Sequence, residues 1–561
     1  MSHTNLKPWQ RFIGLLELER KDIAQIFYYA IFSGAVALSL PLGIQAIVNL
    51  IQGAQVSTSW IVLVILVTLG VLFSGILQLM QIRIVETIQQ RIFVRSSFEL
   101  SYRFPKIKLQ ELRNYYPPEL ANRFFDTLTI QKGLSKILID IPSALLQIVF
   151  ALILLSFYHP FFIVFGILLL FLVFIVFKFT AQRGLSTSLD ESKDKYKVAH
   201  WIQEVARAIV SFKLSGRTKL AIEKNDSLVT DYLSSRESHF KVLLLQFMQM
   251  IGFKVIVTAA LLLIGGALVL NQEMNIGQFV AAEIIILLVI ASVEKLILGL
   301  EPMYDVITSI EKIGQVVDKE LELQEGERPN FDEEISIQLE NIEYKVADRK
   351  KPILKNITLD INQKSRSLIQ GESGSGKSSL LRVIAGVLDP TDGTINVNNY
   401  ALSSLYLNHY RAHLGLSLSE ESPFEASIRE NITFGDDTIT DEQILWALEK
   451  VGLLEFLKLQ PKGLSTVLYP EGKQISYTIA KKIVLARAIV KKPGLLILED
   501  ALDQFNIEET NNIIDFLVSP ENPWSLIVVS SNKRWQQYCD NLITLKDGQI
   551  KSIENAKHIS Q

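Results

Sequence analysis

Residues 367–388 read SLIQGESGSGKSSLLRVIAGVL, and this stretch carries the most specific pattern in the chain. It contains G-x-x-x-x-G-K-[ST], the spacing of a phosphate-binding loop, between an apolar strand and an apolar helix. The glycines allow backbone N–H groups to curl around phosphate oxygens at a helix N-terminus, where the helix dipole favours anions. A merely flexible glycine loop is the alternative, and the flanking strand and helix argue against it. The sequence therefore predicts a nucleotide-phosphate site.

We expect the whole loop to bind the nucleotide, each side chain according to its chemistry. Lys377 is expected to reach the β- and γ-phosphates, and the Ser378 hydroxyl to ligate Mg²⁺. Several classes of protein share this motif, so it does not identify a family by itself. The predicted nucleotide-binding residues are Gly371, Glu372, Ser373, Gly374, Ser375, Gly376, Lys377, Ser378 and Ser379.

The composition combines a bilayer-buried part with a water-soluble part. Hydrophobic residues make up 49% of the 561 residues and the mean hydropathy is +0.26, yet 20% of residues are charged. The net charge of −3 gives no support for a nucleic-acid partner. The single cysteine, Cys539, cannot form an internal disulfide, which fits a reducing compartment. The N-terminal residues lack a signal-peptide layout.

Six apolar runs are long enough to cross the roughly 30 Å of a bilayer's hydrocarbon core. They fall in three pairs, each joined by a short connection, and long polar segments at 83–136 and 180–242 separate the pairs. A soluble ATPase with an apolar core is the alternative that these runs exclude. The predicted spans are 23–51, 60–82, 137–157, 160–179, 243–270 and 276–300.

Positive charge is concentrated on one side of these spans. The long segments are rich in Lys and Arg, whereas the short connections have almost none. Positive residues mark the cytoplasmic side, so both long segments and both termini are expected in the cytoplasm, with the chain multi-pass in the cell (inner) membrane. Apolar residues at three- and four-residue spacing predict that the long segments extend the spanning helices.

A soluble α/β pattern begins at Ile335, where short apolar strands alternate with helical segments. The fold class predicted is therefore a multi-domain membrane protein, a six-helix all-α transmembrane domain followed by an α/β phosphate-loop NTPase domain. The expected boundaries are 1–318 for the transmembrane domain, 319–334 for a charged linker, 335–548 for the nucleotide-binding domain and 549–561 for a polar tail.

Several further motifs resemble those of ABC (ATP-binding cassette) transporters, and six preceding spans are similar to the exporter branch of that family. The stretch at 275–282 loosely resembles the protein- and peptide-secreting exporters, although we expect no room for an N-terminal peptidase domain. The motifs that carry the resemblance are Asn341–Val346, Pro352–Ile357, the phosphate loop, Ser427–Ile432, Leu485–Ile489 and Pro493–Leu498.

Compared with the ABC transporters that it resembles, the sequence differs at several positions that surround the nucleotide in that family. Val346 stands where the family has an aromatic that stacks on adenine, and Tyr344, two residues earlier, is either a displaced substitute or a core aromatic. Ser419 aligns with the glutamine that senses γ-phosphate and Mg²⁺, and its side chain is shorter. Tyr477 and Thr478 occupy the positions of the two signature-loop glycines, so a phenol is expected to obstruct the approach of that helix to the nucleotide.

The two carboxylates of the family are also in reversed order. Glu499 precedes Asp500, whereas the family has Asp and then Glu; Ser531 aligns with the switch histidine, and the dimer-contact loop reads Asp503–Asn506. We take Glu499 and Asp500 as the candidate catalytic residues, and Ser378 with Glu499 as the candidate Mg²⁺ ligands. Misplacing a reacting group by about 1 Å can cost on the order of a hundredfold in rate. Hydrolysis is therefore expected to be slow or absent, although the phosphate loop is intact.

The resemblance implies a half-transporter that binds ATP and Mg²⁺ and works as a homo- or heterodimer in membrane lipid, with a periplasmic adaptor as a further partner. The alternative is a non-hydrolysing ABC-like protein in which ATP is a structural or regulatory ligand for another transporter. Whether it is an enzyme stays open at this point.

Two further groups of residues have competing interpretations. The stretches 116–120 and 204–211 fall where exporters carry short helices that touch the nucleotide domain, or they are ordinary intracellular helix packing. Lys254 and Glu283 lie within the fifth and sixth spans, where ionisable groups are costly. Substrate contact, mutual neutralisation and snorkelling all explain them.

Overall fold

The computed structural model describes residues 7–52, 58–331, 334–346 and 349–555. Within these residues the chain divides into two compact units, 7–105 with 114–319 and 106–113 with 320–555. Residues 53–57 of the first predicted connection, 332–333 of the predicted linker and 556–561 of the predicted tail lie outside the described residues.

The first unit is all helical, and six of its helical stretches are long and apolar enough to span a membrane. This confirms the predicted six spans. The stretches are Arg20–Gln52, Thr58–Lys106, Pro117–Ser156, Phe161–Arg207, Leu220–Leu270 and Ile276–Val317. The helices that compose them are α2 (Arg20–Ala37), α3 (Ser39–Gln52), α4 (Thr58–Arg103), α6 (Pro117–Ala121), α7 (Asp126–Ser156), α8 (Phe161–Arg207), α10 (Leu220–Ala260), α11 (Gly266–Leu270), α12 (Ile276–Leu298) and α13 (Leu300–Val317).

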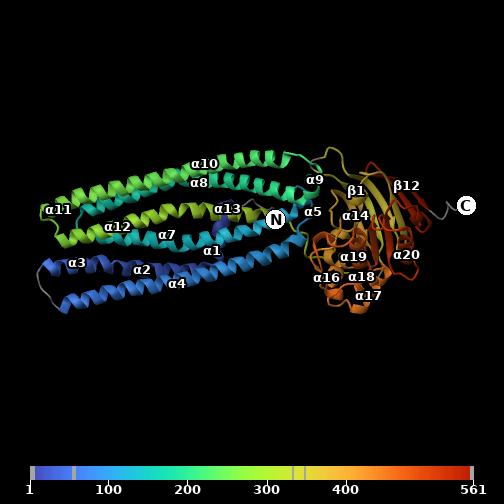
Figure 1. The fold of residues 1–561 in the computed structure, drawn as a ribbon, viewed down its shortest axis with the longest axis horizontal. Helices are drawn as coiled ribbons and strands as arrows, with labels where there is room; N and C mark the ends of the chain where they lie inside the picture. The colour runs from blue at the N-terminus through green and yellow to red at the C-terminus, as the bar shows by residue number, and fades with distance from the viewer. Residues whose placement is uncertain (1–6, 53–57, 332–333, 347–348, 556–561) are drawn as a thin grey trace. The chain divides into compact units, whose positions relative to one another are not determined.

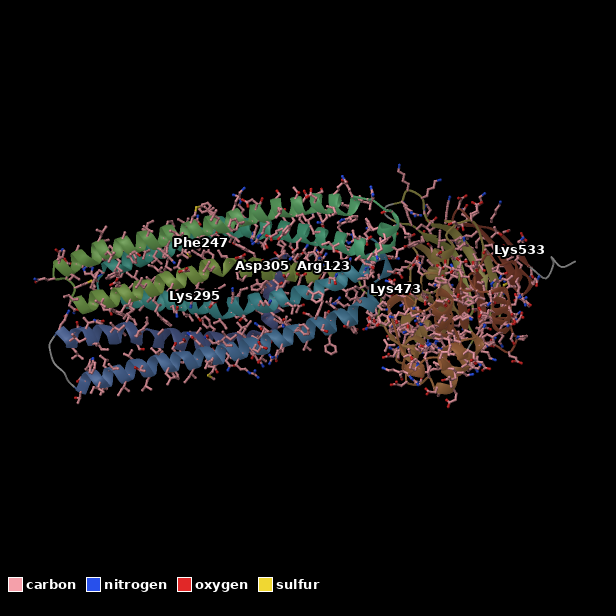
Figure 2. All side chains as sticks on the ribbon, viewed as in Figure 1. Arg123, Phe247, Lys295, Asp305, Lys473 and Lys533 are labelled. Carbon is pink, nitrogen blue, oxygen red and sulfur yellow. The ribbon has the colours of Figure 1, made fainter. Side chains whose placement is uncertain are left out.

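The helices continue well past the apolar runs, because the predicted three- and four-residue spacing persists in the polar segments. Helix α4 is 46 residues long and α8 is 47, and α8 lies side by side with α10 (Figure 1). Side chains project from the bundle along its length, among them Phe247 on α10 and Lys295 on α12 (Figure 2). Many large apolar side chains here are exposed, as expected where lipid replaces water. Short helices α1 (Pro8–Leu18) and α9 (Ile209–Leu214) complete the unit.

The second unit is built on a six-stranded sheet in the order β12-β11-β3-β10-β9-β6, with all strands parallel except the edge strand β12. Strands β9 and β10 are buried throughout, as expected when helices cover both faces of a parallel sheet. The strands are β3 (Arg366–Gln370), β6 (Leu414–Ser417), β9 (Leu495–Glu499), β10 (Ser525–Val529), β11 (Asn541–Lys546) and β12 (Gln549–Asn555).

A second, antiparallel sheet has the order β2-β1-β4-β5 and shares one hydrophobic core with the main sheet. Its strands are β1 (Ile337–Tyr344), β2 (Leu354–Ile361), β4 (Asp392–Val397) and β5 (Tyr400–Ala401), and a small hairpin comprises β7 (Ala426–Ser427) and β8 (Val467–Leu468). The helices of the unit are α5 (Leu109–Leu112), α14 (Lys377–Ile384), α15 (Leu407–Ala412), α16 (Ile428–Thr433), α17 (Asp441–Lys450), α18 (Leu454–Lys458), α19 (Tyr477–Ile489) and α20 (Ile507–Leu517).

Three segments outside the predicted nucleotide-binding domain are attached to this unit. The expected linker is held by Arg411, whose guanidinium donates to both carboxylate oxygens of Glu322 at 2.6 and 2.9 Å. Phe331 is 2% exposed and stacks on His409. Part of the expected polar tail forms β12, because its residues pair in register with β11. Residues 106–113 also belong to this unit, and the Lys108 N–H donates to the carbonyl of Glu320 at 3.0 Å.

Candidate functional site

The phosphate loop connects β3 to α14, and two of its glycines have backbone conformations that other residues rarely adopt. Gly371 has φ +156° and Gly376, which caps α14, has φ +102°. A Cβ on Gly371 would lie 2.2 Å from the carbonyl oxygen of Leu545. The loop therefore needs glycine at these points for its backbone to curl before the helix begins.

Lys377 folds back over the loop. Its Nζ donates to the carbonyl oxygens of Gly371 at 2.8 Å and Glu372 at 2.9 Å. These partners are neutral, so they orient the ammonium without cancelling its charge. The charge is available for a phosphate.

A cleft of about 430 Å³ opens beside the loop, a size that suits a small-molecule ligand. Gly371, Ser373 and Lys377 line one side, and Asp500 and Ser531 lie on the other. The structure therefore brings together part of the predicted loop, one of the two predicted carboxylates and the position of the family's switch histidine.

The remaining loop residues lie in the loop backbone and the first turn of α14, outside the lining of this cleft. Ser375 is buried, and its carbonyl accepts a bond from the Gly548 N–H at 3.1 Å. Ser378 and Ser379 lie half-buried in the first turn of α14, while Gly374 faces open space. They shape the loop and begin the helix that points at the phosphate position.

Of the two predicted catalytic carboxylates, Asp500 is the one that lines the cleft. Loss of hydration, together with the nearby charges of Asp503 and Glu499, raises the pKa of Asp500 to about 6, and the positive charge of Lys377 opposes this rise. Its backbone has φ +47°, a left-handed conformation that aspartate tolerates better than most residues. Asp500 is therefore close to a protonation change at near-neutral pH.

Asp503 is held in the same cleft by two hydroxyl groups. Its carboxylate accepts bonds from Ser530 Oγ at 2.8 Å and Ser531 Oγ at 3.3 Å. Sequence reasoning assigned Asp503 only to a dimer-contact loop. Its bonds to Ser530 and Ser531 could not be read from the sequence, because the parallel pairing of β9 and β10 brings the two following loops together.

Glu499 points away from Asp500 toward Ser419. It is 3% exposed, and its Oε2 accepts bonds from Ser419 Oγ at 3.2 Å and Ser419 N–H at 3.4 Å. Ser419, which we predicted to stand at the γ-phosphate-sensing position, therefore contacts Glu499, and the two predicted carboxylates have different surroundings.

The oxygen chemistry at this site is compatible with Mg²⁺. Glu499 keeps a second carboxylate oxygen, and Ser378 and Ser419 offer hydroxyl groups, which are hard ligands of the kind Mg²⁺ prefers. Mg²⁺ usually takes only one or two protein ligands together with phosphates and water. The residues present therefore fit the ion, and Ser378 with Glu499 would hold it.

The family's signature position lies at the start of α19. Ser476 caps this helix by accepting the Ile479 N–H at 3.2 Å, and Tyr477 is 50% exposed in the first turn. The Lys481 ammonium lies 5.6 Å from the centre of the Tyr477 ring. A bulky, solvent-facing phenol thus stands at the helix N-terminus, while Thr478 beside it is half-buried.

The aromatic near the predicted adenine position is part of the core. Tyr344 is 6% exposed at the end of β1, opposite Leu354 of β2. Val346 is partly buried against the same core. Of the two interpretations of Tyr344, the structure supports the core aromatic.

In the membrane unit, Lys254 of α10 pairs with Glu294 of α12 at 2.5 Å. The pair neutralises both charges, which supports the neutralisation interpretation for Lys254. Its partner differs from the one that sequence reasoning considered, since Glu283 lies elsewhere on α12 and is half-buried.

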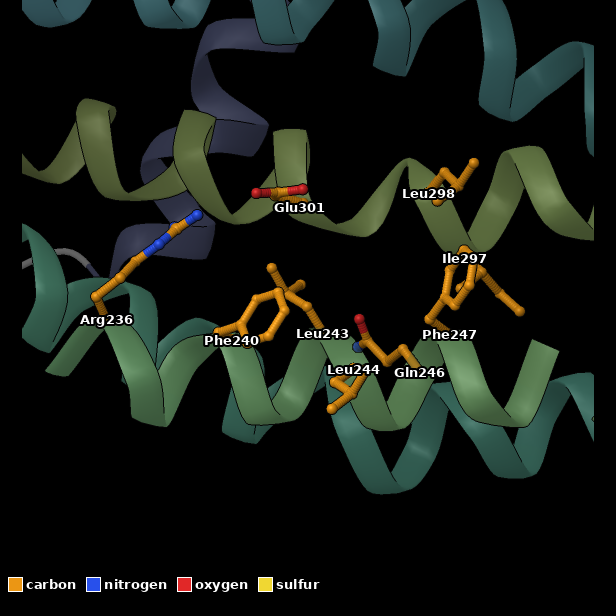
Figure 3. A pocket seen from close by; sticks show the side chains of 9 residues that line it. All are labelled: Arg236, Phe240, Leu243, Leu244, Gln246, Phe247, Ile297, Leu298 and Glu301. Atoms are coloured by element: carbon orange, nitrogen blue, oxygen red, sulfur yellow. The ribbon is translucent and has the colours of Figure 1, made fainter. Parts of the chain in front are cut away.

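An apolar groove of about 300 Å³ lies between the middle of α10 and the junction of α12 with α13 (Figure 3). Phe240 and Phe247 of α10 and Ile297 of α12 form its walls, while Arg236 and Glu301 lie at one end.

The comparisons with known proteins agree with this architecture. The model for the ABC transporter transmembrane region matches residues 23–293, and the ABC transporter model matches residues 354–503. A solved structure of a bacterial Atm1-family ABC exporter with ATP bound superposes with a TM-score of 0.85 over 96% of each chain, at 15% identity. This likeness concerns the fold.

Two curated relatives are leukotoxin translocation ATP-binding proteins named LktB. That of Mannheimia haemolytica is 24% identical over 357 residues, which are 63% of this chain and 50% of that protein. That of Bibersteinia trehalosi is 26% identical over 336 residues, which are 59% of this chain and 47% of that protein. This chain spans about half the length of the curated relatives it matches.

The two matched regions cover the helical unit and the centre of the nucleotide unit, and the full-length fold agrees with both. The chain belongs to the ABC transporters, with an exporter-type transmembrane domain and an ATP-binding ABC domain fused in one polypeptide.

Proposed function

We propose that this chain is one half of a dimeric exporter that binds ATP at the phosphate loop and couples this binding, with slow or absent hydrolysis, to outward transport. The observation that carries the proposal is the contrast within one site. The Lys377 ammonium donates to two neutral carbonyls and can engage phosphate, whereas Glu499 is buried and already bonded to Ser419.

Binding is supported by groups that are positioned in advance. The curled loop, the N-terminus of α14 and Lys377 all present positive potential to the cleft. Bound ATP supplies a phosphate chain that bridges two nucleotide domains, and the residues of this chain hold and orient it. Ser378 and Glu499 are the ligands we propose for Mg²⁺.

Weak hydrolysis is supported by the positions that would have to act on water. Asp500 is one methylene shorter than the glutamate expected there, and the Ser531 hydroxyl, which is shorter than the histidine expected there, donates to Asp503 at 3.3 Å. In a dimer, Glu499, Asp500 and Ser531 would weaken one composite site, and Tyr477 would obstruct the other. Both kinds of change occur in one chain, so a competent partner would not restore both sites.

Cargo and partners are proposed from family likeness. The LktB relatives are named for leukotoxin translocation. We propose a peptide or protein cargo, export from the cytoplasm across the inner membrane, and a periplasmic adaptor as partner. The one-sided positive charge of the long segments supports cytoplasmic termini and a cytoplasmic nucleotide domain.

A second function is favoured by the Ser419–Glu499 contact, which occupies a carboxylate that turnover would need. In that case ATP is a regulatory or structural ligand, and the chain assists another transporter without hydrolysing ATP.

The test compares full-length protein with Lys377→Ala in lipid nanodiscs, measuring binding of a fluorescent ATP analogue and release of phosphate. Loss of charge-assisted contacts to phosphate predicts about tenfold to hundredfold weaker binding in Lys377→Ala. Equal binding by both proteins would refute the nucleotide site. Binding with no phosphate release above the variant favours the regulatory function. Turnover comparable with an active exporter, abolished by the substitution, would contradict our proposal of weak hydrolysis.

A further inference from the structure

Lys481 is a buried lysine that neither the sequence motifs nor the proposed function uses. It lies in the first half of α19 and is only 4% exposed. Its ammonium donates to three carbonyl oxygens, those of Leu418 at 3.3 Å, Ser419 at 2.6 Å and Glu421 at 2.8 Å. A buried ammonium is costly unless its protons are bonded, and these three acceptors match its three donors.

The three acceptors belong to one short loop that follows β6. We name residues 418–421 the Ser419 loop. Lys481 satisfies the carbonyls that this loop turns toward α19, and the Leu418 carbonyl also accepts the Glu421 N–H at 3.1 Å. The loop and the lysine therefore stabilise each other, although about 60 residues of sequence separate them.

The same loop presents Ser419 to Glu499. While Lys481 holds the carbonyl of Ser419, the N–H and hydroxyl of Ser419 both bond to Glu499 Oε2. A continuous chain of contacts thus runs from α19, at the signature position, through the Ser419 loop to the carboxylate that ends β9. All of these contacts are made by the protein's own atoms within the nucleotide unit.

We propose that Lys481 is a positioning residue that locks the Ser419 loop against Glu499 whether or not a nucleotide is bound. The loop at the γ-phosphate-sensing position is then fixed by an internal cation and does not respond to nucleotide. The consequence for transport rests on the proposed function, but the lock itself is a property of the protein alone.

The neighbouring lysine supplies a matched control. Lys482 is 5% exposed on the same helix, and its ammonium bonds to Glu509 at 2.8 Å, away from the Ser419 loop. Lys481→Met and Lys482→Met each replace a buried lysine by an uncharged chain of similar length. Both substitutions change the packing of helix α19 to a comparable extent, but only Lys481→Met removes the bonds to the Ser419 loop.

The experiment is hydrogen–deuterium exchange of the full-length protein in nanodiscs, followed on peptides that cover residues 414–423, with and without Mg-ATP. In the wild type the loop amides exchange slowly, and ATP leaves their rate unchanged. In Lys481→Met they exchange about tenfold faster without ATP, because opening no longer breaks bonds to a charged donor. In Lys482→Met they exchange at the wild-type rate.

A conservative variant separates positioning from general stability. Lys481→Gln keeps an amide donor at shorter reach, so it should restore part of the loop protection lost in Lys481→Met. If Lys481 acts by positioning the loop, the thermal midpoints of the two Lys481 variants should not follow the order of their loop protection. If Lys481→Met does not fold, the Lys481→Gln protein and the wild-type response to ATP still decide the question.

Two results would overturn the proposal. One is unchanged loop exchange in both Lys481 variants without ATP. The other is a wild-type loop whose protection rises severalfold on adding Mg-ATP, since a locked loop has no such response. Failure of the proposed function is recognised separately, as a lack of binding of the fluorescent ATP analogue, and it leaves the measurement without ATP valid.

Discussion

Asp500 is the group whose charge should depend most on pH near neutrality within the nucleotide site. Its carboxyl lines the same cleft as Lys377, and its pKa is raised from 3.8 to about 6 by lost hydration and by the neighbouring carboxylates Asp503 and Glu499. Above pH 6 it carries a negative charge in the cleft where phosphates are expected to bind. We predict that Asp500→Asn binds ATP more tightly than the wild type at pH 7.5.

The size of the effect on ATP affinity depends on the repulsion between the Asp500 carboxylate and the phosphates. Two unit charges about 4 Å apart interact by about 4 kcal/mol near a protein surface, which is an upper limit for this repulsion. Asp500 is an exposed residue, and solvent screens its interactions, so we expect about 1 kcal/mol. This corresponds to about fivefold tighter binding of ATP by Asp500→Asn.

The sign of the pH dependence is fixed by the direction in which the pKa moves. Because the folded pKa lies above the unfolded value, ionisation of Asp500 costs folding free energy that is fully present above about pH 6 and absent below about pH 3.8. The advantage of Asp500→Asn, in both stability and ATP affinity, should therefore shrink as the pH falls from 7.5 to 5.

The assay is equilibrium binding of a fluorescent ATP analogue to full-length protein at pH 7.5 and pH 5, without Mg²⁺. Protonation of ATP itself affects both proteins equally and cancels in the ratio of their dissociation constants. Asp437→Asn, which removes an exposed carboxylate that does not line this cleft, should give a ratio near one at both pH values. A ratio for Asp500→Asn that is the same at both pH values would refute the reasoning.

Three further predictions test other parts of the chain. Lys254→Met should lower the thermal midpoint in detergent, because it leaves Glu294 unpaired among apolar helices at a cost of about 2 kcal/mol. The double variant Lys254→Met with Glu294→Leu should recover most of this lost stability. A double variant as unstable as Lys254→Met would exclude the ion pair as the cause. The Cys539 thiol, whose pKa burial raises to about 12, should react slowly with an aromatic disulfide at pH 8 and rapidly in denaturant; equal rates would contradict its burial. Ser476→Ala should destabilise the nucleotide domain by about 1 kcal/mol, because it removes the N-terminal cap of α19. Ser476→Asp keeps a capping oxygen and should not destabilise the domain. Similar thermal midpoints for the two variants would argue against the cap.

The features that the sequence predicted well are encoded in short stretches. The phosphate loop depends on glycines, one lysine and one adjoining helix, all within about twenty residues, so its pattern predicts its shape. The spans depend only on length and apolar content. In each case residues close together in the sequence meet the physical requirement, so tertiary contacts have little influence on the structure of the segment.

The features that sequence reasoning missed depend on long-range packing. The lysine pair at 481–482 interrupts an otherwise apolar helix, which signals that each needs a buried partner, but the partners come from elements distant in the sequence. Residues 549–555 were expected to belong to a polar tail, and they form a strand because they pair with β11. Lys254 was considered together with Glu283, yet the packing of α10 on α12 presents Glu294 instead.

The nucleotide site therefore combines two opposite physical conditions. The groups that would hold phosphates, Lys377 and the N-terminus of α14, have neutral backbone partners and can bind a ligand at little cost of rearrangement. The groups that would have to move or polarise water, Glu499 and the Ser419 loop, already have hydrogen bonds within the protein. Binding of ATP needs only the groups that hold phosphates, whereas hydrolysis of ATP needs both sets of groups. Breaking the second set of bonds would have to be offset by new contacts to the nucleotide, and the short Ser419 side chain offers few. We infer that in this chain the energy available from ATP is that of binding, so any work done on the membrane domain has to come from association of the nucleotide domains and their separation.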